Sequence, residues 1–505
     1  MRPVDKSLSR RQMNTHWDVI VIGAGMSGLG AGIRLAMAGK KVLILEQHYS
    51  VGGLNGFYVR DKILYDVGLH ALTNFVPPGF RGHPLTKICR QLRIPYEALR
   101  LEEQRGSKIQ FPGIALRFNN HFSFFLENIR QHFPKQIDAF LKLDAAVEGI
   151  SDTALDGSDF ISTREYLRSY LNDPLLIEML LLPLFYYGSA HANDLDWRQF
   201  AILYKALYKE GFARPKGGVR TICRLLCERY RTCDGVLKLK TTVRSIVLND
   251  SRAVGVELAS GEILYATQIL SSVGYRETQA LCGKIVAGEA SRLSFAETIT
   301  TYEATPESCG WHDTITFFNT SERVAYEPTE KLIDLRSGVI CIPENYGVRA
   351  SGDSSSTPVS EPTVSDKLQQ NPTASSSAAI SQSTTHRLTL RTTHLAGYDA
   401  WKKLSPETYR EQKKACLSTS RACAFNILRG QPSQTILAED MFTPLTVERF
   451  TRHINGAIYG STKKFRDGRI GYENLFLCGT DQGFLGIVGA LLSGISIANY
   501  HCLKG

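Results

Sequence analysis

The sequence predicts an α/β fold that begins with a Rossmann-like β-α-β unit and contains more than one domain. The first observation is a short apolar run, Asp18 to Ile22, which is typical of a buried parallel strand. The second is a glycine-rich turn after it, which leads into a helix-like stretch ending near Ala38 and then a second apolar run, Lys41 to Leu45. The third is the length of 505 residues, which exceeds one compact domain.

The glycine-rich turn has the spacing Gly23-x-Gly25-x-x-Gly28. Glycine at the first position allows a tight turn, at the second it lets the backbone approach a pyrophosphate, and at the third it lets the helix pack on the strand. The helix N-terminus would present free N–H groups to the diphosphate. Glu46, at the end of the next strand, can accept hydrogen bonds from ribose hydroxyls and would repel a 2′-phosphate. The motif predicts a dinucleotide site that disfavours NADP and leaves FAD and NAD open.

The middle of the chain contains both helix-like and strand-like stretches. Residues 122–150 and 174–209 are rich in Leu, Phe and Tyr and are predicted to be mostly helical. Three strand-like runs, joined at Asn249-Asp250 and Ser260-Gly261, predict a small antiparallel meander. These runs are Val236 to Leu248, Ala253 to Leu258 and Glu262 to Ser272.

Residues 350–385 differ in composition from the rest of the chain, because Ser, Thr, Pro and Gln dominate and aromatic residues are almost missing. Such a segment cannot bury enough apolar surface to become ordered. Strand-like runs flank it, Ser337 to Pro343 and Arg387 to His394. It is therefore predicted to be a disordered insertion between two neighbouring strands.

The stretch from Gln482 to Leu503 contains no formally charged residue. Its length would permit a membrane crossing. Four glycines and the polar Ser493, Ser496 and Asn499 dilute its hydrophobicity. A helix that is apolar on all sides can also be buried in a large protein, and this interpretation is favoured.

The composition excludes several classes of protein. The net charge of +10 is spread along the chain, so nothing beyond the charge favours a nucleic-acid partner. The basic first twelve residues are not followed by an apolar run, so no secretory signal is expected. Eleven cysteines are scattered without disulfide-scaffold or zinc spacing. They are predicted to be free thiols in a reducing compartment, and no metal site is predicted.

Further motifs give the sequence a resemblance to a known family. They are Gly52-Gly53, Tyr65-Asp66-Val-Gly68-Leu-His70, Pro215-Lys-Gly217-Gly218, Thr443-Pro444-Leu-Thr446, and Gly479-Thr-Asp481 before the last apolar stretch. Together with the N-terminal motif they resemble the FAD-dependent carotenoid oxidoreductases, a group that includes phytoene desaturases, carotenoid isomerases and retinol saturases. This group belongs to the wider amine-oxidase-like flavoprotein superfamily.

The resemblance implies an α/β fold in which a discontinuous Rossmann-like FAD-binding domain, residues 1–75, 211–280 and 431–505, carries an inserted α+β substrate-binding domain, residues 76–210 and 281–430. It also implies a set of FAD-binding residues. These are Gly23, Gly25 and Gly28 on the pyrophosphate, Glu46 on the adenosine ribose, Gly52 and Gly53 toward the flavin, Val243 at the adenine, Gly479 and Asp481 at the diphosphate and ribityl chain, and Ile487, Val488 and Gly489 facing the isoalloxazine. Leu54 departs from the pattern, since many relatives have Arg after the paired glycines.

The activity implied by the resemblance is an FAD-dependent oxidation or reduction at carbon–carbon bonds of a long apolar polyene, a carotenoid or a retinoid. Desaturation, isomerisation and saturation by hydride exchange with flavin N5 stay open, and no catalytic residue is assigned. Asp66 and His70 lie where the family approaches the flavin, so they are either an acid or base or a turn aspartate and a core histidine. The stretch Leu175 to Tyr187, with Phe122, Phe124 and Phe125, either lines an apolar channel or packs in a core.

Other functions share these nucleotide motifs. One alternative is a flavin amine oxidase or a hydroxysqualene dehydroxylase-like enzyme, although the aromatic pair usual near an amine oxidase flavin is not located. Another is a non-catalytic isoprenoid-binding protein of the GDP-dissociation-inhibitor type, which the intact nucleotide motif disfavours. An apolar polyisoprenoid substrate would come from a bilayer, so we expect a cytoplasmic protein attached peripherally to a membrane surface. The oligomeric state stays open.

Overall fold

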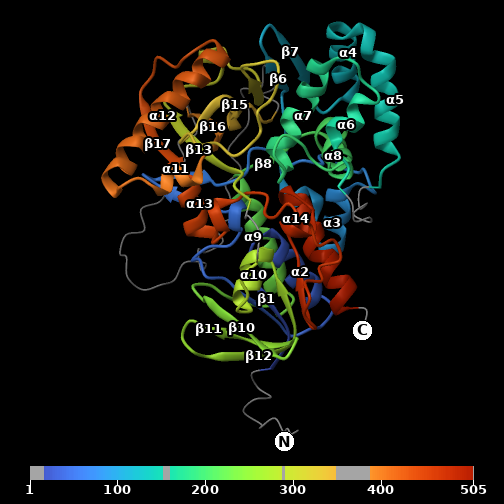
Figure 1. Ribbon diagram of the computed structural model, residues 1–505, viewed down its shortest axis with the longest axis vertical. Helices are drawn as coiled ribbons and strands as arrows, with labels where there is room; N and C mark the ends of the chain where they lie inside the picture. The colour runs from blue at the N-terminus through green and yellow to red at the C-terminus, as the bar shows by residue number, and fades with distance from the viewer. Residues whose placement is uncertain (1–15, 152–159, 287–290, 348–386, 504–505) are drawn as a thin grey trace, which may run out of the picture.

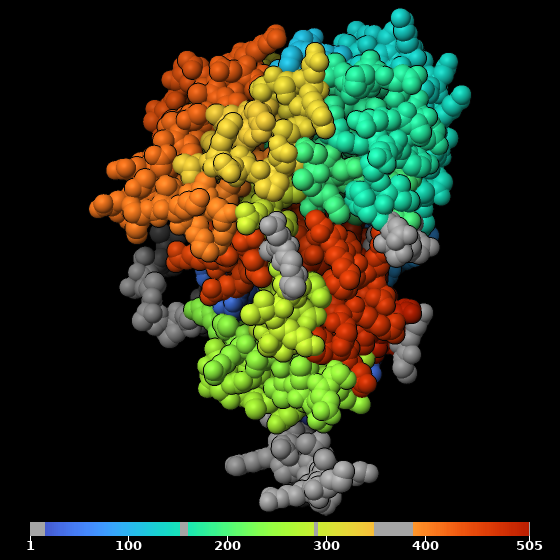
Figure 2. Space-filling view, viewed as in Figure 1, coloured from blue at the N-terminus to red at the C-terminus, as the bar shows by residue number. Residues whose placement is uncertain are grey.

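The computed structural model describes residues 16–151, 160–286, 291–347 and 387–503, and it places them in two lobes (Figure 1). Each lobe is built around a seven-stranded sheet. The last stretch of the chain, red in Figure 2, lies between the lower lobe and the upper lobe. The α/β class predicted from the sequence is confirmed.

The sheet of the lower lobe has a parallel centre and an antiparallel edge. Strand β1 pairs in parallel with β2 and β12, β2 pairs with β9, and β12 also pairs with β18. The antiparallel strands β10 and β11 extend the edge beyond β12. The bounds are β1 (His16–Ile22), β2 (Val42–Leu45), β9 (Val236–Lys238), β10 (Val243–Asn249), β11 (Arg252–Leu258), β12 (Ile263–Ser271) and β18 (Leu475–Leu477). These strands come from distant parts of the chain, while the domain boundaries given above stay predictions.

The prediction of one strand from Val236 to Leu248 is wrong. Strand β9 ends at Lys238 and pairs with β2, whereas β10 begins at Val243 and pairs with β11. Between them Lys240 has a φ of 53°, and its backbone N–H donates to the carbonyl of His48 (3.0 Å). The chain turns here because it wraps over the segment that follows β2, a long-range contact that local residue patterns do not show.

Three helices cover one face of the lower sheet: α2 (Met26–Ala36), α9 (Val219–Arg231) and α14 (Gly486–Ile497). Helices α2 and α14 pack so closely that a Cβ added at Gly30 would lie 3.0 Å from the carbonyl oxygen of Leu491. The predicted burial of the charge-free C-terminal stretch is therefore confirmed. In the part of the chain that the structure describes, no helix combines the length and the apolarity needed to cross a bilayer.

The upper lobe has a sheet in the order β17-β13-β16-β15-β14-β6-β7. Strands β15 and β16 are antiparallel neighbours, as predicted for the two runs that flank residues 350–385, and that segment lies outside the described residues. The strand bounds are β6 (Ser107–Phe111), β7 (Ile114–Phe118), β13 (Ser294–Tyr302), β14 (Ile315–Asn319), β15 (Asp334–Cys341), β16 (Leu388–Ala396) and β17 (Ile436–Phe442).

Helices flank this sheet on both sides in Figure 1. One group is α4 (Phe122–His132), α5 (Ile137–Glu148), α6 (Thr163–Arg168), α7 (Pro174–Gly188) and α8 (Trp197–Tyr204), and the other is α11 (Tyr398–Lys402) and α12 (Pro406–Leu428). The predicted helical stretch 122–150 is interrupted before Pro134, which cannot continue α4. Helix α7 continues through Pro183 and is buried along almost its whole length.

The residues considered for an apolar channel separate in the structure. Phe125 and the leucines of α7 other than Leu175 are fully buried in the main core of the upper lobe, and Phe122 and Leu175 pack against that core. Phe124 is 40% exposed on the outside of α4. The structure therefore assigns most of this set to core packing.

Candidate functional site

The turn between β1 and α2 has the geometry that its glycines require. Gly23 has a φ of 95°, a conformation that residues with a Cβ rarely adopt. A Cβ added at Gly28 would overlap the carbonyl oxygen of Gly23 and lie 3.1 Å from its carbonyl carbon. A Cβ added at Gly25 would meet nothing within 4 Å. The turn is thus tightly packed behind Gly28 and open in front of Gly25.

A second glycine turn lies beside the first. Gly52 forms a parallel bridge with Gly25, and its N–H donates to the carbonyl of Ala24 (2.9 Å). Gly53 has a φ of 59°, is exposed, and a Cβ added there would lie 3.5 Å from the Cα of Gly25. The two turns thus lie side by side with their backbone open at Gly25 and Gly53, and we call this backbone surface the glycine groove (Gly23, Gly25, Gly52 and Gly53).

Glu46 is buried at the end of β2 and fixes the edge of this groove. Its Oε2 accepts a hydrogen bond from the N–H of Ala24 and its Oε1 accepts one from the N–H of His48, both at 2.8 Å. A carboxylate oxygen accepts more than one hydrogen bond, so ribose hydroxyls can still bind here. Val243 begins β10 two residues after Thr241, whose N–H donates to the carbonyl of Glu46 (2.8 Å).

His48 was not singled out from the sequence, yet its Nε2 is buried and has no hydrogen-bond partner among the described residues. Its Nδ1 accepts from the N–H of Ser50 (3.2 Å). An unpaired polar atom beside a buried carboxylate costs free energy unless a ligand satisfies it.

Gly479 closes the groove from the C-terminal side. It has a φ of 95°, its N–H donates to Ser493 Oγ (2.6 Å), and an added Cβ would lie 2.9 Å from Ser27 Oγ. The turn after β18 therefore packs against the first turn of α2, at the carboxyl ends of the parallel strands, where open α/β sheets bind ligands.

Asp481 is 3% exposed and ties two other turns to this edge. Its Oδ2 accepts from the N–H of Tyr275 (2.7 Å) and its Oδ1 from the N–H of Ser461 (2.6 Å). Lys464 Nζ lies 3.7 Å from Oδ1. Burial lowers the pKa of Lys464, and Asp481 opposes this shift. A contact between Asp481 and a diphosphate stays a prediction.

The start of α14 supplies the remaining predicted residues. Gly486 has a φ of 71°, is exposed, and an added Cβ would meet only open space. Ile487 and Val488 are 6% and 3% exposed and pack in the core beneath the groove. A Cβ added at Gly489 would lie 3.0 Å from the carbonyl carbon of Phe484. The backbone at Gly486, the first residue of α14, is accessible, whereas the side chains of Ile487 and Val488 are not.

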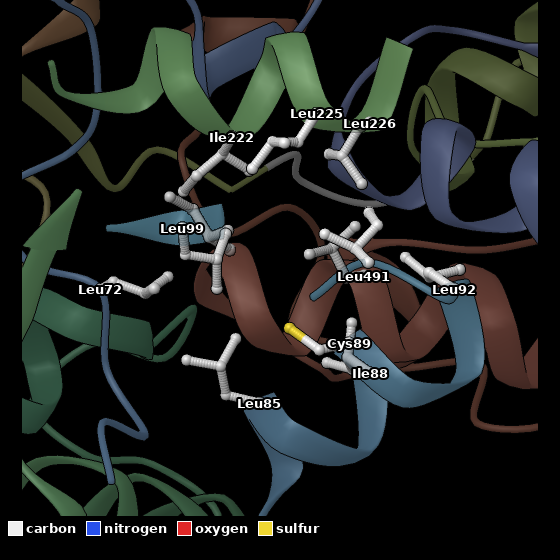
Figure 3. Close-up of a pocket in the computed structure, with 12 residues that line it drawn as sticks. Leu72, Leu85, Ile88, Cys89, Leu92, Leu99, Ile222, Leu225, Leu226 and Leu491 are labelled. Carbon is white, nitrogen blue, oxygen red and sulfur yellow. The ribbon is translucent and has the colours of Figure 1, made fainter. Parts of the chain in front are cut away.

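Ile487 also lines an apolar pocket that the sequence did not reveal (Figure 3). Its empty volume is about 380 Å³, open space at its mouth included. The pocket lies between α9, α14 and α3 (Pro84–Leu92). Its lining residues are Leu72, Leu85, Ile88, Cys89, Leu92, Ile94, Leu99, Ile222, Leu225, Leu226, Ile487 and Leu491.

The described residues fit the FAD that the resemblance implies. The backbone is accessible at Gly25, Gly53 and Gly486, where a Cβ would reach into open space or the facing turn. The buried Nε2 of His48 and the carboxylate of Glu46 are polar groups that a nucleotide can satisfy. In the described ranges, no group of three or more His, Cys, Asp or Glu side chains could hold a metal ion.

Charged side chains meet between the groove and the upper sheet, and we call them the interface cluster (Asp66, His70, Arg214, Glu297 and Arg391). Asp66 accepts from Arg214 and from the N–H at the start of α9 (3.1 Å). Arg391 Nε donates to Glu297 Oε1 (2.5 Å), and His70 Nε2 lies 3.4 Å from the same oxygen. The pKa of Glu297 is lowered, because Arg391 and His70 outweigh the effect of its burial.

Most of the interface cluster could not be found from the sequence. Asp66 and His70 stand in a predicted motif, but Arg214, Glu297 and Arg391 come from β8 (Ala213–Pro215), β13 and β16. Arg391 lies inside a predicted strand among apolar and hydroxyl residues. A cation at such a position indicates that it has a partner, and this was the sequence signal available for the cluster. Which partner it meets depends on the pairing of distant strands.

Aromatic side chains line the interior of the upper lobe beside this cluster. Tyr186 stacks on Phe295 with ring centroids 5.3 Å apart, and Phe295 meets Tyr459 edge-on at 5.9 Å. Tyr187 stacks on Phe212 at 5.4 Å, and its buried hydroxyl has no partner among the described residues. These rings pack against one another in the core of the upper lobe, so they make the surroundings of the interface cluster apolar.

The chain matches the family model described as flavin containing amine oxidoreductase over residues 26–500. Curated relatives include prolycopene isomerase from Arabidopsis thaliana, 25% identical over 304 residues, which are 54% of this chain and 50% of that protein. Human all-trans-retinol 13,14-reductase is 25% identical over 311 residues, 54% of this chain and 50% of that protein. The chain thus spans about half the length of these relatives.

Solved structures share the fold at low identity. An oxidoreductase from Methanosarcina mazei has a TM-score of 0.61 and 14% identity, with 95% of this chain and 99% of that chain covered. A Rab GDI from Plasmodium falciparum has a TM-score of 0.51 and 12% identity, with 96% and 97% covered. The shared fold therefore does not separate enzymes from the GDI class.

Proposed function

Because the chain belongs to the flavin containing amine oxidoreductase family, with FAD as its cofactor, we propose that it oxidises or reduces carbon–carbon bonds of a long apolar polyene. The substrate class is a carotenoid or a retinoid, and the reaction is desaturation, isomerisation or saturation. The observation that carries the proposal is the apolar, aromatic surroundings of the interface cluster, which joins the loop beside the glycine groove to the upper sheet.

The curated relatives support the polyene class. Their printed names describe an isomerase of prolycopene and a reductase of retinol, two different reactions on conjugated isoprenoids. An amine substrate that is buried as a cation would need an unpaired carboxylate to balance its charge. The one buried carboxylate of the interface cluster on the upper sheet, Glu297, is already paired with Arg391, which favours an uncharged substrate.

The residues of the glycine groove would hold FAD by their backbone. Gly23, Gly25 and Gly28 would bind the diphosphate at the start of α2, and Glu46 would bind the adenosine ribose. When bound, FAD supplies the hydride exchange that such reactions need. The aromatic side chains exclude water and orient the polyene, and Arg391 and Arg214 fix the loop of residues 67–70 by donating to its carbonyls.

The test is anaerobic incubation of the FAD-loaded protein with phytoene, a cis-lycopene or retinol, once with oxidised and once with reduced flavin, followed by chromatography of the polyenes. Polyene conversion that consumes oxidised flavin indicates desaturation. Polyene conversion that consumes reduced flavin indicates saturation, and rearrangement with no net change in the flavin oxidation state indicates isomerisation. Protein that binds FAD but oxidises an amine instead would favour the amine oxidase alternative. Protein that takes up no FAD but binds isoprenoids would favour the GDI-like alternative.

We also propose that the protein attaches peripherally to a membrane from which it takes its substrate, with the cytoplasm as the expected compartment. Phe80 is 57% exposed and is followed by Arg81, in the loop just before α3, a helix that lines the apolar pocket. An exposed aromatic beside a cation is suited to an anionic bilayer surface. The expected result is co-sedimentation with anionic phospholipid vesicles that Phe80→Ser weakens, and equal binding by both proteins would contradict it.

A further inference from the structure

We propose that His70, held in place by Glu297, is the residue that takes a proton from the polyene or returns one to it. The inference rests on the proposed function, because it assumes that a polyene occupies the space that His70 faces.

His70 lies between the glycine groove and the upper sheet. The N–H of Val67 donates to the carbonyl of Gly56 (2.9 Å). A Cβ added at Gly68 would overlap the carbonyl oxygen of Leu54 and lie 3.2 Å from Asn55 Oδ1. The segment that carries His70 therefore starts beside the turn of Gly52 and Gly53 and runs from it to the upper sheet, where the ring meets Glu297 and Thr393.

The backbone around His70 is held by several donors. Tyr346 Oη donates to the carbonyl of His70 (3.0 Å), and Arg214 Nη1 lies 3.3 Å from the same oxygen. Arg391 Nη1 donates to the carbonyl of Leu69 (2.9 Å). These bonds fix the ring orientation, which is what a group that exchanges protons needs.

The two ring nitrogens have different surroundings. Nε2 lies 3.4 Å from Glu297 Oε1 and 3.3 Å from Thr393 Oγ1. A carboxylate facing Nε2 favours the tautomer that carries hydrogen there, so the lone pair of the neutral ring is on Nδ1. Nδ1 makes no hydrogen bond to any residue that the structure describes. It is therefore the nitrogen free to exchange a proton.

The ring of His70 is partly accessible. Its side chain is 15% exposed, whereas Leu69 and Leu72 are 1% exposed and Cys341, whose Sγ donates to the His70 carbonyl, is fully buried. Gly68, on the other side of Leu69, is exposed. The proposal places the polyene at this accessible edge of the ring.

The charged groups around the ring keep it neutral. Burial lowers the pKa of His70, Glu297 on β13 raises it, and Arg391 on β16 and Arg214 on β8 lower it further. Asp66 on β4 (Ile63–Asp66) is paired with Arg214, and burial raises the pKa of the Cys341 thiol to about 12. The resting ring is thus a proton acceptor, because its pKa lies below the usual range.

The step balances for each of the three reactions. In desaturation, a C–H bond of the polyene breaks, its proton forms an N–H bond at Nδ1, and the hydride of the neighbouring carbon leaves to oxidised FAD. In saturation, the neutral ring first takes a proton from water at Nδ1; this N–H bond then breaks as a C–H bond forms, and the hydride would come from reduced FAD. In isomerisation, the ring takes a proton from the polyene and returns it at another carbon, with no net electron transfer. The imidazole recovers its starting state by exchange with water.

The test uses FAD-loaded wild type, His70→Gln and Glu297→Gln, with His394→Gln as a matched control. His394 is a buried histidine on β16, next to Thr393, and its ring binds Ser337 and Ser420 on the side of α12. Removal of a general acid or base costs about 10²- to 10⁴-fold in rate. We expect His70→Gln to lower kcat about 100-fold or more at unchanged FAD content, with KM changed far less, and His394→Gln to retain wild-type kcat.

The pH profile gives a readout that a structural role would not move. Because Glu297 raises the pKa of His70, Glu297→Gln should move the limb of the kcat profile that His70 sets to lower pH. This is the acidic limb when the ring takes the proton and the basic limb when it returns one, and the shift is expected even if His70→Gln fails to fold. Any of three results would overturn this inference while leaving the proposed function intact. They are a wild-type kcat in His70→Gln, equal losses of kcat in His70→Gln and His394→Gln, and a pH profile that does not move in Glu297→Gln. Wild-type protein that binds FAD but converts no polyene would overturn the proposed function and this inference with it.

Discussion

Gly25→Ala should weaken FAD binding and Gly28→Ala should lower the stability of the fold, although the two glycines are three residues apart in one turn. A Cβ at Gly28 would overlap the carbonyl oxygen of Gly23, and overpacking of this kind costs about 1–3 kcal/mol of unfolding free energy. A Cβ at Gly25 meets nothing within 4 Å. At this N-cap, alanine is worse than glycine by a few tenths of a kcal/mol, about as much as it gains by restricting the unfolded chain.

Gly25→Ala should therefore leave the stability of the apoprotein within about 1 kcal/mol of wild type, while its methyl group occupies the groove. We expect its affinity for FAD to fall at least about tenfold, equivalent to about 1.4 kcal/mol. The assay pairs urea unfolding of the apoproteins, followed by circular dichroism, with titration of FAD fluorescence. The reasoning is refuted if Gly25→Ala binds FAD like wild type, or if Gly28→Ala unfolds like wild type.

Three further predictions concern stability. Arg164→Met should lower the free energy of unfolding in urea by about 3–5 kcal/mol, because it leaves the buried carboxylate of Glu178 without its cation. The double variant Arg164→Met, Glu178→Leu should recover most of this loss, and equal losses in the single and double variants would contradict the prediction. Gly494→Ala should cost about 1–3 kcal/mol in the same assay because the new Cβ would overlap the carbonyl oxygen of Ser27, and wild-type stability would show that α2 and α14 can separate. Burial lowers the pKa of His394 from 6.5 to about 4, so the unfolded chain binds its proton more readily and stability falls as the pH drops from about 6.5 to about 4. This part of the pH dependence is worth at most about 3 kcal/mol and should vanish in His394→Gln, whereas an unchanged slope between pH 4 and 6.5 would contradict it.

The nucleotide half of the site could be predicted from the sequence because its signals are local. A positive φ at Gly23, a close approach at Gly28 and a carboxylate at the end of β2 are each visible as a residue type at a fixed spacing. Even here the details needed the structure. The carboxylate oxygens of Asp481 accept hydrogen bonds from the backbone of two turns, which the sequence does not indicate. The sequence likewise does not indicate that Nε2 of His48 is buried without a partner among the described residues.

The substrate half could not be predicted to the same depth, because its residues meet through pairing of distant segments. Glu297 contacts Arg391 only because β13 and β16 are antiparallel neighbours, and both reach His70 only because the upper sheet faces the loop after β4. The apolar composition of α7 was visible, but whether it lines a channel or a core depends on what packs against it.

The most direct test of the central claim is an anaerobic titration of the FAD-loaded protein with a polyene, in which flavin and polyene absorption are followed together. The account predicts that one flavin oxidation state is converted in proportion to the polyene consumed, or that a cis-polyene rearranges while the flavin spectrum recovers. Flavin and polyene spectra that stay unchanged in both oxidation states, with FAD bound and polyene present in excess, would contradict it.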